Sequence, residues 1–254
     1  MISEEGQKLP VIKECIQEKE SPPRVFQSVF ANQELKFLKD IHQRSLEDPA
    51  NCAEKLLQAK GTPLGQMAHP KGSLKKELEF LFREKLQGIL DEPYQMAFSF
   101  HRNYFPYGIH TDASYDSQTV IYKQGIVPLE VDPVDAEVYT VIFKQKCYHS
   151  ISYPNEVETI RALSSKQLKF IEHLSEGESE ISDEELEAYW QGEASKERLK
   201  GFSVDLAFRW LPGDMAMWDR SHLHCSSDFA GHGVNGKLGL MWITERERAE
   251  EEDL

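Results

Sequence analysis

From about Tyr94 onward the chain is divided into short runs of aromatic and β-branched residues, and this feature restricts the fold most. Clusters of Gly, Pro and Asp separate the runs, which read MAFSFHRNYF, SQTVIY, VYTVIF, LAFRW, DMAMW and LGLMWIT. Short runs with turn residues between them are typical of strands in a β-sandwich or barrel, whereas a parallel sheet needs helices between its strands. We therefore predict a mainly β core.

Two amphipathic helices are expected before this core, over residues 32–42 and 73–90. In both segments apolar residues recur every three or four positions, which places them on one helical face. Asn32 is a plausible N-cap of the first helix, and Ser73 opens the second. Pro93 prevents the second helix from continuing, because proline lacks the backbone N–H that a helix interior requires.

A helical pattern returns between about Asn155 and Lys200, inside the β-rich region. The segments SSKQLKFIEHL and SDEELEAYW both begin with serine and are rich in helix formers. Ser182 and Glu185 have the spacing of a capping box, in which each side chain binds the backbone N–H of the other residue. We interpret this region as a helical insertion in a β scaffold and as a possible lid.

The chain of 254 residues is expected to form one domain, since single β domains of this length are common. Residues 1–23 are predicted to be an irregular lead-in, residues 24–244 the domain and residues 245–254 an acidic tail. Of the net charge of −14, residues 172–187 contribute −8 and the tail contributes −4. The remainder is nearly neutral and has no basic stripe, so nucleic acid is a poor candidate partner.

The sequence also predicts a soluble, cytoplasmic protein without a membrane partner. No apolar run approaches the roughly 20 residues that cross a bilayer. The N-terminal residues are acidic and lack the apolar segment of a signal peptide. The four cysteines, Cys15, Cys52, Cys147 and Cys225, are scattered without a disulfide or metal-binding spacing, which favours free thiols in a reducing compartment.

His110 and Asp112 form a candidate metal-binding pair. They are two residues apart in the strand-like run Tyr107–Asp112, so an extended backbone directs both side chains to one face. A histidine from a distant strand would complete a face of two histidines and one carboxylate, which leaves positions open on the metal. This ligand set suits an iron(II) oxygenase, although ligand softness alone does not exclude zinc or manganese.

The segment Gly213–His224 supplies the third candidate ligand. It begins with a Gly-Asp pair, continues with an apolar run that includes Trp218, and ends with a histidine at its twelfth residue. Together with the His-Thr-Asp triplet, this order resembles the 2-oxoglutarate- and Fe(II)-dependent oxygenase superfamily, particularly its prolyl-hydroxylase-like branch. The motifs occupy about thirty residues, whereas the resemblance covers most of Arg24–Thr244.

The resemblance implies a double-stranded β-helix, which is a jelly-roll, cupin-like core with N-terminal helices. It implies that His110, Asp112 and His224 bind Fe(II) as the catalytic metal centre. It further implies 2-oxoglutarate as cosubstrate, O2 as oxidant and hydroxylation of an unidentified small-molecule or peptide substrate. His222 remains an alternative third ligand, since strand ends often bulge near active sites.

The same resemblance implies a basic residue for the distal carboxylate of 2-oxoglutarate. Lys237 occupies the place where the family commonly has arginine, and Gly239 stands where a hydroxyl residue is expected. Tyr107 is the candidate that replaces this hydroxyl, Lys144 is a rival to Lys237, and Tyr104 is a further pocket candidate. Lysine lacks the two-pronged geometry of arginine, so the exchange is not neutral.

The departures at Lys237 and Gly239 leave a second hypothesis open. A cupin-like metal-binding protein, or a metalloenzyme that does not use 2-oxoglutarate, would not need the usual arginine and hydroxyl. Cupins commonly have two close histidines in one motif, whereas His-Thr-Asp contains one. Neither the substrate nor the oligomeric state follows from the sequence.

Overall fold

The computed structural model describes residues 20–47, 52–59, 62–90, 94–112, 119–147, 171–172, 181–190 and 199–247. Helices and strands follow one another in this order: β1 (Arg24–Phe26), α2 (Asn32–Glu47), β2 (Cys52–Ala59), β3 (Thr62–Pro70), α3 (Gly72–Leu86), β4 (Gln95–Asn103), β5 (Thr119–Asp132), β6 (Tyr139–Cys147), β7 (Ile171–Glu172), α5 (Asp183–Tyr189), β8 (Val204–Arg209), β9 (Met215–Asp219), β10 (His222–Ser226) and β11 (Gly236–Glu247).

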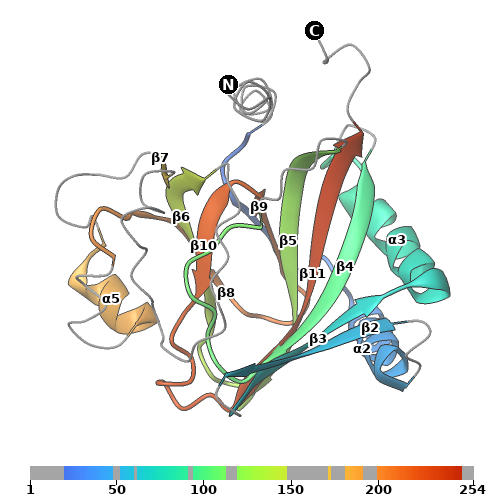
Figure 1. Ribbon diagram of the computed structural model, residues 1–254, viewed down its shortest axis with the longest axis horizontal. Coiled ribbons are helices and arrows are strands. Elements are labelled where there is room, and N and C mark those ends of the chain that lie inside the picture. The colour runs from blue at the N-terminus through green and yellow to red at the C-terminus, as the bar shows by residue number, and fades with distance from the viewer. Residues whose placement is uncertain are drawn as a thin grey trace, which may run out of the picture.

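The strands form two antiparallel sheets. The larger sheet has the order β1-β9-β5-β11-β4-β3-β2, and in the smaller sheet β6 pairs with β10, β7 and β8. Ile126 and Trp218 from the larger sheet and Ile142 and Phe208 from the smaller sheet belong to one buried cluster, so the sheets pack face to face. Figure 1 shows α2 and α3 on the outer side of the larger sheet and α5 beside the smaller one. The predicted mainly β core with flanking helices is confirmed.

Strand β11 separates the core under the helices from the space between the sheets. Its residues Leu238, Leu240 and Trp242 are at most 1% exposed and belong to the cluster that packs against α2 and α3. Its alternate residues Lys237 and Met241 line a cavity between the sheets. This alternation follows from the period of two in a strand, which directs successive side chains to opposite faces.

Both predicted helices exist, with different ends. The Ala31 carbonyl oxygen accepts the first helical hydrogen bond, from Leu35 N at 2.9 Å, so Asn32 is the first helical residue of α2 and not its N-cap. Helix α3 begins at Gly72 after the cap residue Lys71, and it ends at Leu86. Leu90 is buried because a turn at Gly88, with φ of 75°, folds the chain back.

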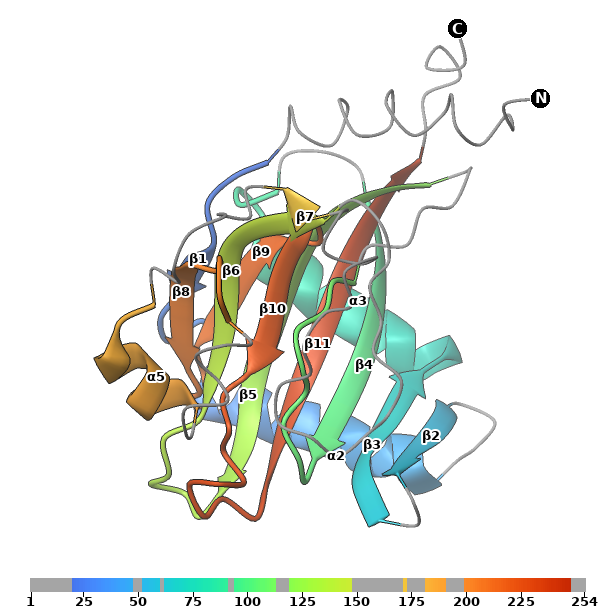
Figure 2. The same cartoon turned by 60° about the vertical axis from the view of Figure 1, so that its left-hand side comes forward.

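The sequence did not predict the hairpin of β2 and β3, which extends the larger sheet through the pairing of β3 with β4. The run DMAMW becomes β9, and the chain turns before it reaches His224. The turn lies at Arg220 and Ser221, so that β9 pairs in the larger sheet and β10 in the smaller one. Figure 2 shows this change of sheet, with β9 behind β10 and β6.

The predicted insertion is described only in part. The capping box is confirmed, because Glu185 N donates to Ser182 Oγ at 3.2 Å and Ser182 N donates to Glu185 Oε2 at 2.9 Å. The helix predicted over SSKQLKFIEHL is wrong at Ile171–Glu172, which form β7 because they pair with Cys147 and Lys146. The rest of that segment lies outside the described residues.

The predicted ends of the domain are also only partly described. Residues 20–23 are irregular as expected, while residues 1–19 and 248–254 lie outside the described part. Strand β11 continues to Glu247, three residues into the predicted tail, because it pairs with β5 as far as Thr119. Cys147 and Cys225 are buried. Among the helices that the structure describes, none is long and apolar enough to span a membrane.

Candidate metal centre

His110, Asp112 and His224 converge between the two sheets. One ligand atom from each residue lies within 4.8 Å of the others. Two hydrogen bonds of 3.0 Å join the backbones of His110 and His224, N to O in both directions, although the residues are far apart in sequence. Asp112 Oδ2 lies 3.2 Å from His224 Nε2. The three side chains therefore form one face of two nitrogens and a carboxylate, as the residue spacing predicts.

In both histidine rings a backbone carbonyl oxygen contacts Nδ1, and this contact fixes the direction in which Nε2 points. His110 Nδ1 lies 2.8 Å from Gly108 O, and His224 Nδ1 lies 3.2 Å from His222 O. A carbonyl oxygen can only accept, so in both rings Nδ1 carries a proton. This arrangement is common for histidines that bind metals, because the backbone contact fixes the tautomer and the ring orientation.

The charges of the three residues also suit a cation. Burial, and then the neighbouring His224, lower the pKa of His110 to about 4, so this ring is neutral at pH 7. Burial alone would raise the pKa of Asp112, but His224, His110 and Arg220 outweigh it and hold that pKa well below its usual range. An ionised carboxylate beside a neutral imidazole is the protonation state that metal binding requires.

Two buried side chains hold Asp112. Arg220 Nε and Nη2 donate to Asp112 O at 3.1 and 2.7 Å, while Arg220 Nη1 donates to Glu245 Oε1 at 2.9 Å. Gln124, with its amide nitrogen toward the carboxylate, donates to Asp112 Oδ2 at 3.0 Å and accepts from Trp218 Nε1 at 2.5 Å. Gln124 was not predicted, although a glutamine with zero exposure in an apolar strand is a signal for such a role.

Replacing Gln124 with leucine is expected to lower metal affinity by about 10- to 100-fold, because the carboxylate loses the donor that orients it. Isothermal titration with Fe(II) under anaerobic conditions measures the change. Gln145→Leu is the matched control: its amide is also buried and bonded, to Ser203 N and Gly201 O. Equal affinities for the two variants would contradict a role of Gln124 in holding the ligand.

His222, the alternative third ligand, does not join the cluster. A shift in register between His222 and His224 interrupts the pairing of β10 with β6, so the spacing of two residues does not place both rings on one face. His222 Nδ1 contacts Phe143 O at 2.9 Å, and its Nε2 lies 4.0 Å from Asp219 Oδ2. The geometry therefore favours His224.

A cavity of about 210 Å³ adjoins the three residues and reaches Lys237. Lys237 is only 2% exposed, its Nζ donates to Ser226 Oγ at 3.1 Å, and it lies 3.9 Å from the centroid of the Trp210 ring. Burial lowers the pKa of Lys237 to about 7. No carboxylate of the residues described here contacts this ammonium group, so the cavity offers a cationic site without an anion.

Two residues of the cavity wall also carry buried polar atoms. His101 Nε2 and Asn103 Oδ1 have no hydrogen-bond partner among the described residues. Asn103 is the register partner of Lys237 on the neighbouring strand β4. Both atoms are enclosed by the protein, so other atoms of these two residues line the cavity.

Solved structures with this architecture include two enzymes of nogalamycin biosynthesis. The epimerase SnoN, solved in complex with Fe3+, alpha ketoglutarate and nogalamycin RO, is 10% identical, with a TM-score of 0.50 over 98% of this chain and 88% of that chain. The alpha ketoglutarate-dependent carbocyclase SnoK is also 10% identical, with a TM-score of 0.50 over 94% of this chain and 85% of that chain. The fold is a double-stranded β-helix.

A prolyl-4-hydroxylase from Pseudomonas putida is more distant, with 9% identity and a TM-score of 0.44 over 94% of this chain and 98% of that chain. Comparisons with models of protein families and with curated protein sequences gave no match.

Within this double-stranded β-helix, the structure explains the glycine at position 239. A Cβ atom added there would lie 2.8 Å from Cη2 of Trp210, so the Trp210 ring occupies the space of the expected hydroxyl side chain. Hydroxyl groups come from other strands: Ser226 binds Lys237, and Thr140 Oγ1 accepts from Trp210 Nε1 at 2.9 Å. The sequence did not indicate either residue, since only the pairing of β6 with β10 brings them here.

Of the other residues predicted to bind the cosubstrate, only Tyr107 lies at the cavity. Tyr107 lines the cavity, its hydroxyl lies 3.8 Å from Met67 Sδ, and burial raises its pKa to about 12, so it stays protonated. Tyr104 is 39% exposed and does not line the cavity. Lys144 also lies outside the cavity. Its side chain is on the face of β6 that is exposed to solvent. Of the two lysines, only Lys237 is placed to meet a ligand at the three converging residues.

Proposed function

We propose that this protein is a 2-oxoglutarate- and Fe(II)-dependent dioxygenase that hydroxylates a small-molecule or peptide substrate. One observation carries the proposal: two histidines, one carboxylate and a buried lysine without an anion share one cavity. The three converging residues would hold iron and leave positions for cosubstrate and O2. The fold shared with SnoN and SnoK supports this function.

Lys237 is the feature that favours a dicarboxylate cosubstrate. An ammonium group in a buried site is unfavourable unless it meets an anion, and its neighbours are a hydroxyl and aromatic rings. A ligand with a keto acid at one end and a carboxylate at the other would satisfy the metal and Lys237 together.

The residues of the chain define what the site does when it is loaded. Bound iron and 2-oxoglutarate supply oxidative decarboxylation coupled to activation of O2. Asp112 offsets part of the metal charge, and Gln124 and Arg220 keep its carboxylate and backbone in place. Trp210 and Trp218 form apolar walls that limit water around the ligands. The protonated Tyr107 hydroxyl is available as a donor in the same cavity.

Anaerobic titration of the purified protein with Fe(II) and then with 2-oxoglutarate tests the proposal. We expect a weak visible charge-transfer band to develop only after the second addition, because the band requires the keto acid to chelate the iron. Lys144→Met is expected to leave the band unchanged. Iron binding without a band would favour a cupin-like metalloprotein that does not use 2-oxoglutarate. A failure to bind iron would overturn the metal centre itself.

A further inference from the structure

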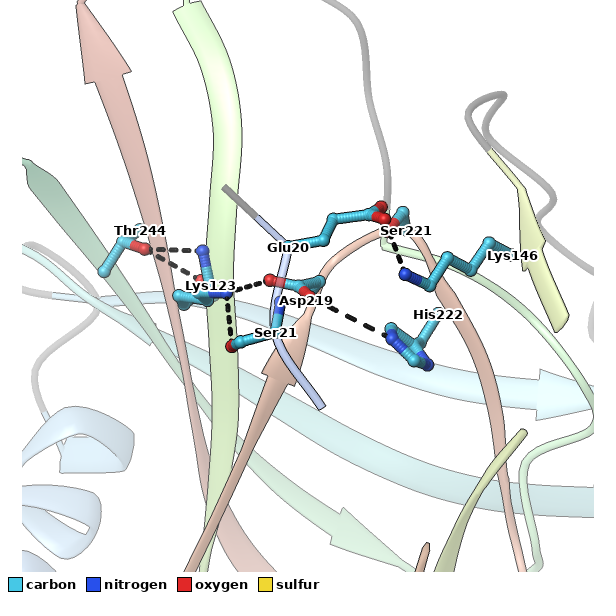
Figure 3. Close-up of polar contacts among 8 residues, drawn as sticks. All are labelled: Glu20, Ser21, Lys123, Lys146, Asp219, Ser221, His222 and Thr244. Atoms are coloured by element: carbon cyan, nitrogen blue, oxygen red, sulfur yellow. Dashed lines mark hydrogen bonds and ion pairs between the residues drawn. The ribbon is translucent and has the colours of Figure 1, made fainter. Parts of the chain in front are cut away.

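The four residues before β1, Glu20–Pro23, lie across the turn that joins β9 to β10, and we call them the N-terminal strap. Ser21 N donates to Asp219 Oδ2 at 2.8 Å, and Ser221 Oγ donates to Glu20 Oε1 at 2.7 Å. Figure 3 shows the strap between these two residues of the turn. The strap therefore holds the turn from both sides of its central residue, Arg220.

Two lysines tie the strap to both sheets. Lys123, from β5 of the larger sheet, donates to Ser21 Oγ at 2.9 Å and pairs with Asp219, and both side chains of this pair are at most 5% exposed. Lys146, from β6 of the smaller sheet, donates to Glu20 Oε2 at 2.5 Å. The turn, the strap and the two lysines thus form one polar cluster where the chain passes from one sheet to the other (Figure 3).

This turn is directly connected to the candidate metal ligands. Its central residue Arg220 donates twice to the backbone oxygen of Asp112. Ser221 O accepts from Cys147 N at 2.8 Å, and His224 follows three residues later on β10. A displacement of the turn would therefore move Asp112 through Arg220 and His224 through the chain.

The strap does not act by hydrophobic packing. Residues 20–23 belong to none of the buried apolar clusters of the described chain, so their contacts with the turn are polar. Partly buried polar contacts of this kind select a geometry more than they add stability. Their direction toward residues 219–221 points to a role in alignment.

We propose that Glu20 and Ser21 are positioning residues that keep Asp112 and His224 in the geometry for metal binding, by holding the turn at residues 219–221. This inference rests on the proposed metal centre. It adds to that centre two residues that do not line the cavity.

The test compares Fe(II) affinity, measured by anaerobic isothermal titration of the full chain, between the unchanged protein and Glu20→Ala. We expect the dissociation constant to rise by about three- to tenfold, less than the roughly 10- to 100-fold typical when a residue in contact with a ligand is removed. Glu20→Gln keeps one oxygen acceptor for Lys146, and its amide N–H can donate to Ser221 Oγ, so this variant is expected to restore most of the affinity. Ser21→Pro, which lacks the N–H bound to Asp219, is expected to weaken binding as Glu20→Ala does.

Glu34→Ala is the matched control, because Glu34 forms a comparably buried ion pair with Lys85 on the far side of the larger sheet. It should leave the dissociation constant unchanged. Hydrogen exchange of the amides of residues 221–225 in the metal-free protein should accelerate in Glu20→Ala and not in Glu34→Ala. Unchanged affinity and exchange in Glu20→Ala and Ser21→Pro, with iron bound by the unchanged protein, would overturn the inference alone. Absence of iron binding in the unchanged protein would instead overturn the metal centre and the inference with it.

Discussion

Replacing Asp112 with alanine is expected to abolish iron binding and, with it, the production of succinate from 2-oxoglutarate. The variant keeps two imidazoles but loses the one carboxylate of the cluster, so the charge of the cation is no longer offset within a buried site. We expect the affinity for Fe(II) to fall by at least about 100-fold, the upper range for residues that only support a ligand. Isothermal titration and a succinate assay measure the two effects.

Asp214→Ala serves as the control for this prediction. Its carboxylate accepts from Ser28 N at 2.9 Å in the turn before β9, and it is not part of the metal cluster. It should bind iron as the unchanged protein does. Retention of full iron affinity by Asp112→Ala would show that the ligands lie elsewhere in the chain.

Replacing Lys237 with methionine is expected to have two opposite effects. The apparent affinity for 2-oxoglutarate should fall by at least about 30-fold, equivalent to about 2 kcal/mol, because the buried carboxylate of the ligand loses its cation. The unliganded protein should become more stable, because an apolar side chain of similar length replaces a lysine whose charged form is destabilised by burial. Chemical denaturation and titration with 2-oxoglutarate measure the two effects on one preparation.

The stability effect should depend on pH. The pKa of Lys237 is about 7 in the folded protein, against 10.5 for a lysine in water. Between these values the unfolded chain binds more protons than the folded one, so this residue makes the free energy of unfolding rise with pH. In Lys237→Met the free energy of unfolding should therefore no longer show this rise between pH 7 and about 10. In Lys144→Met the rise should remain. If the free energy of unfolding of Lys237→Met rises with pH as steeply as that of the unchanged protein, Lys237 does not cause the pH dependence.

The sequence predicted the fold well where local patterns and tertiary structure agree. Aromatic and β-branched runs became β4, β6, β8 and β11 because their side chains fill pleated, buried surfaces. Strands β2 and β3 contain Gly, Pro and several polar residues, so no local pattern marks them. Their extended form depends on pairing with β4, which is distant in the sequence.

The same division applies to the site. His110 and Asp112 follow from two-residue spacing in an extended segment, and His224 follows from its position in a motif. Gln124 and Ser226 could not be predicted in this way, because one comes from β5 and the other from β10. The departure at Gly239 was visible in the sequence. Its cause, the ring of Trp210, lies on another segment that only the packing of the two sheets brings there.

In strand β11, residues that line the cavity alternate with residues that support the core. Lys237 and Met241 face the cavity, while Leu238, Leu240 and Trp242 belong to the core beneath the helices. A one-residue insertion or deletion would exchange these faces, placing the lysine under the helices and leucines beside the metal ligands. A change in the cavity lining along this strand is therefore confined to substitution at alternate positions.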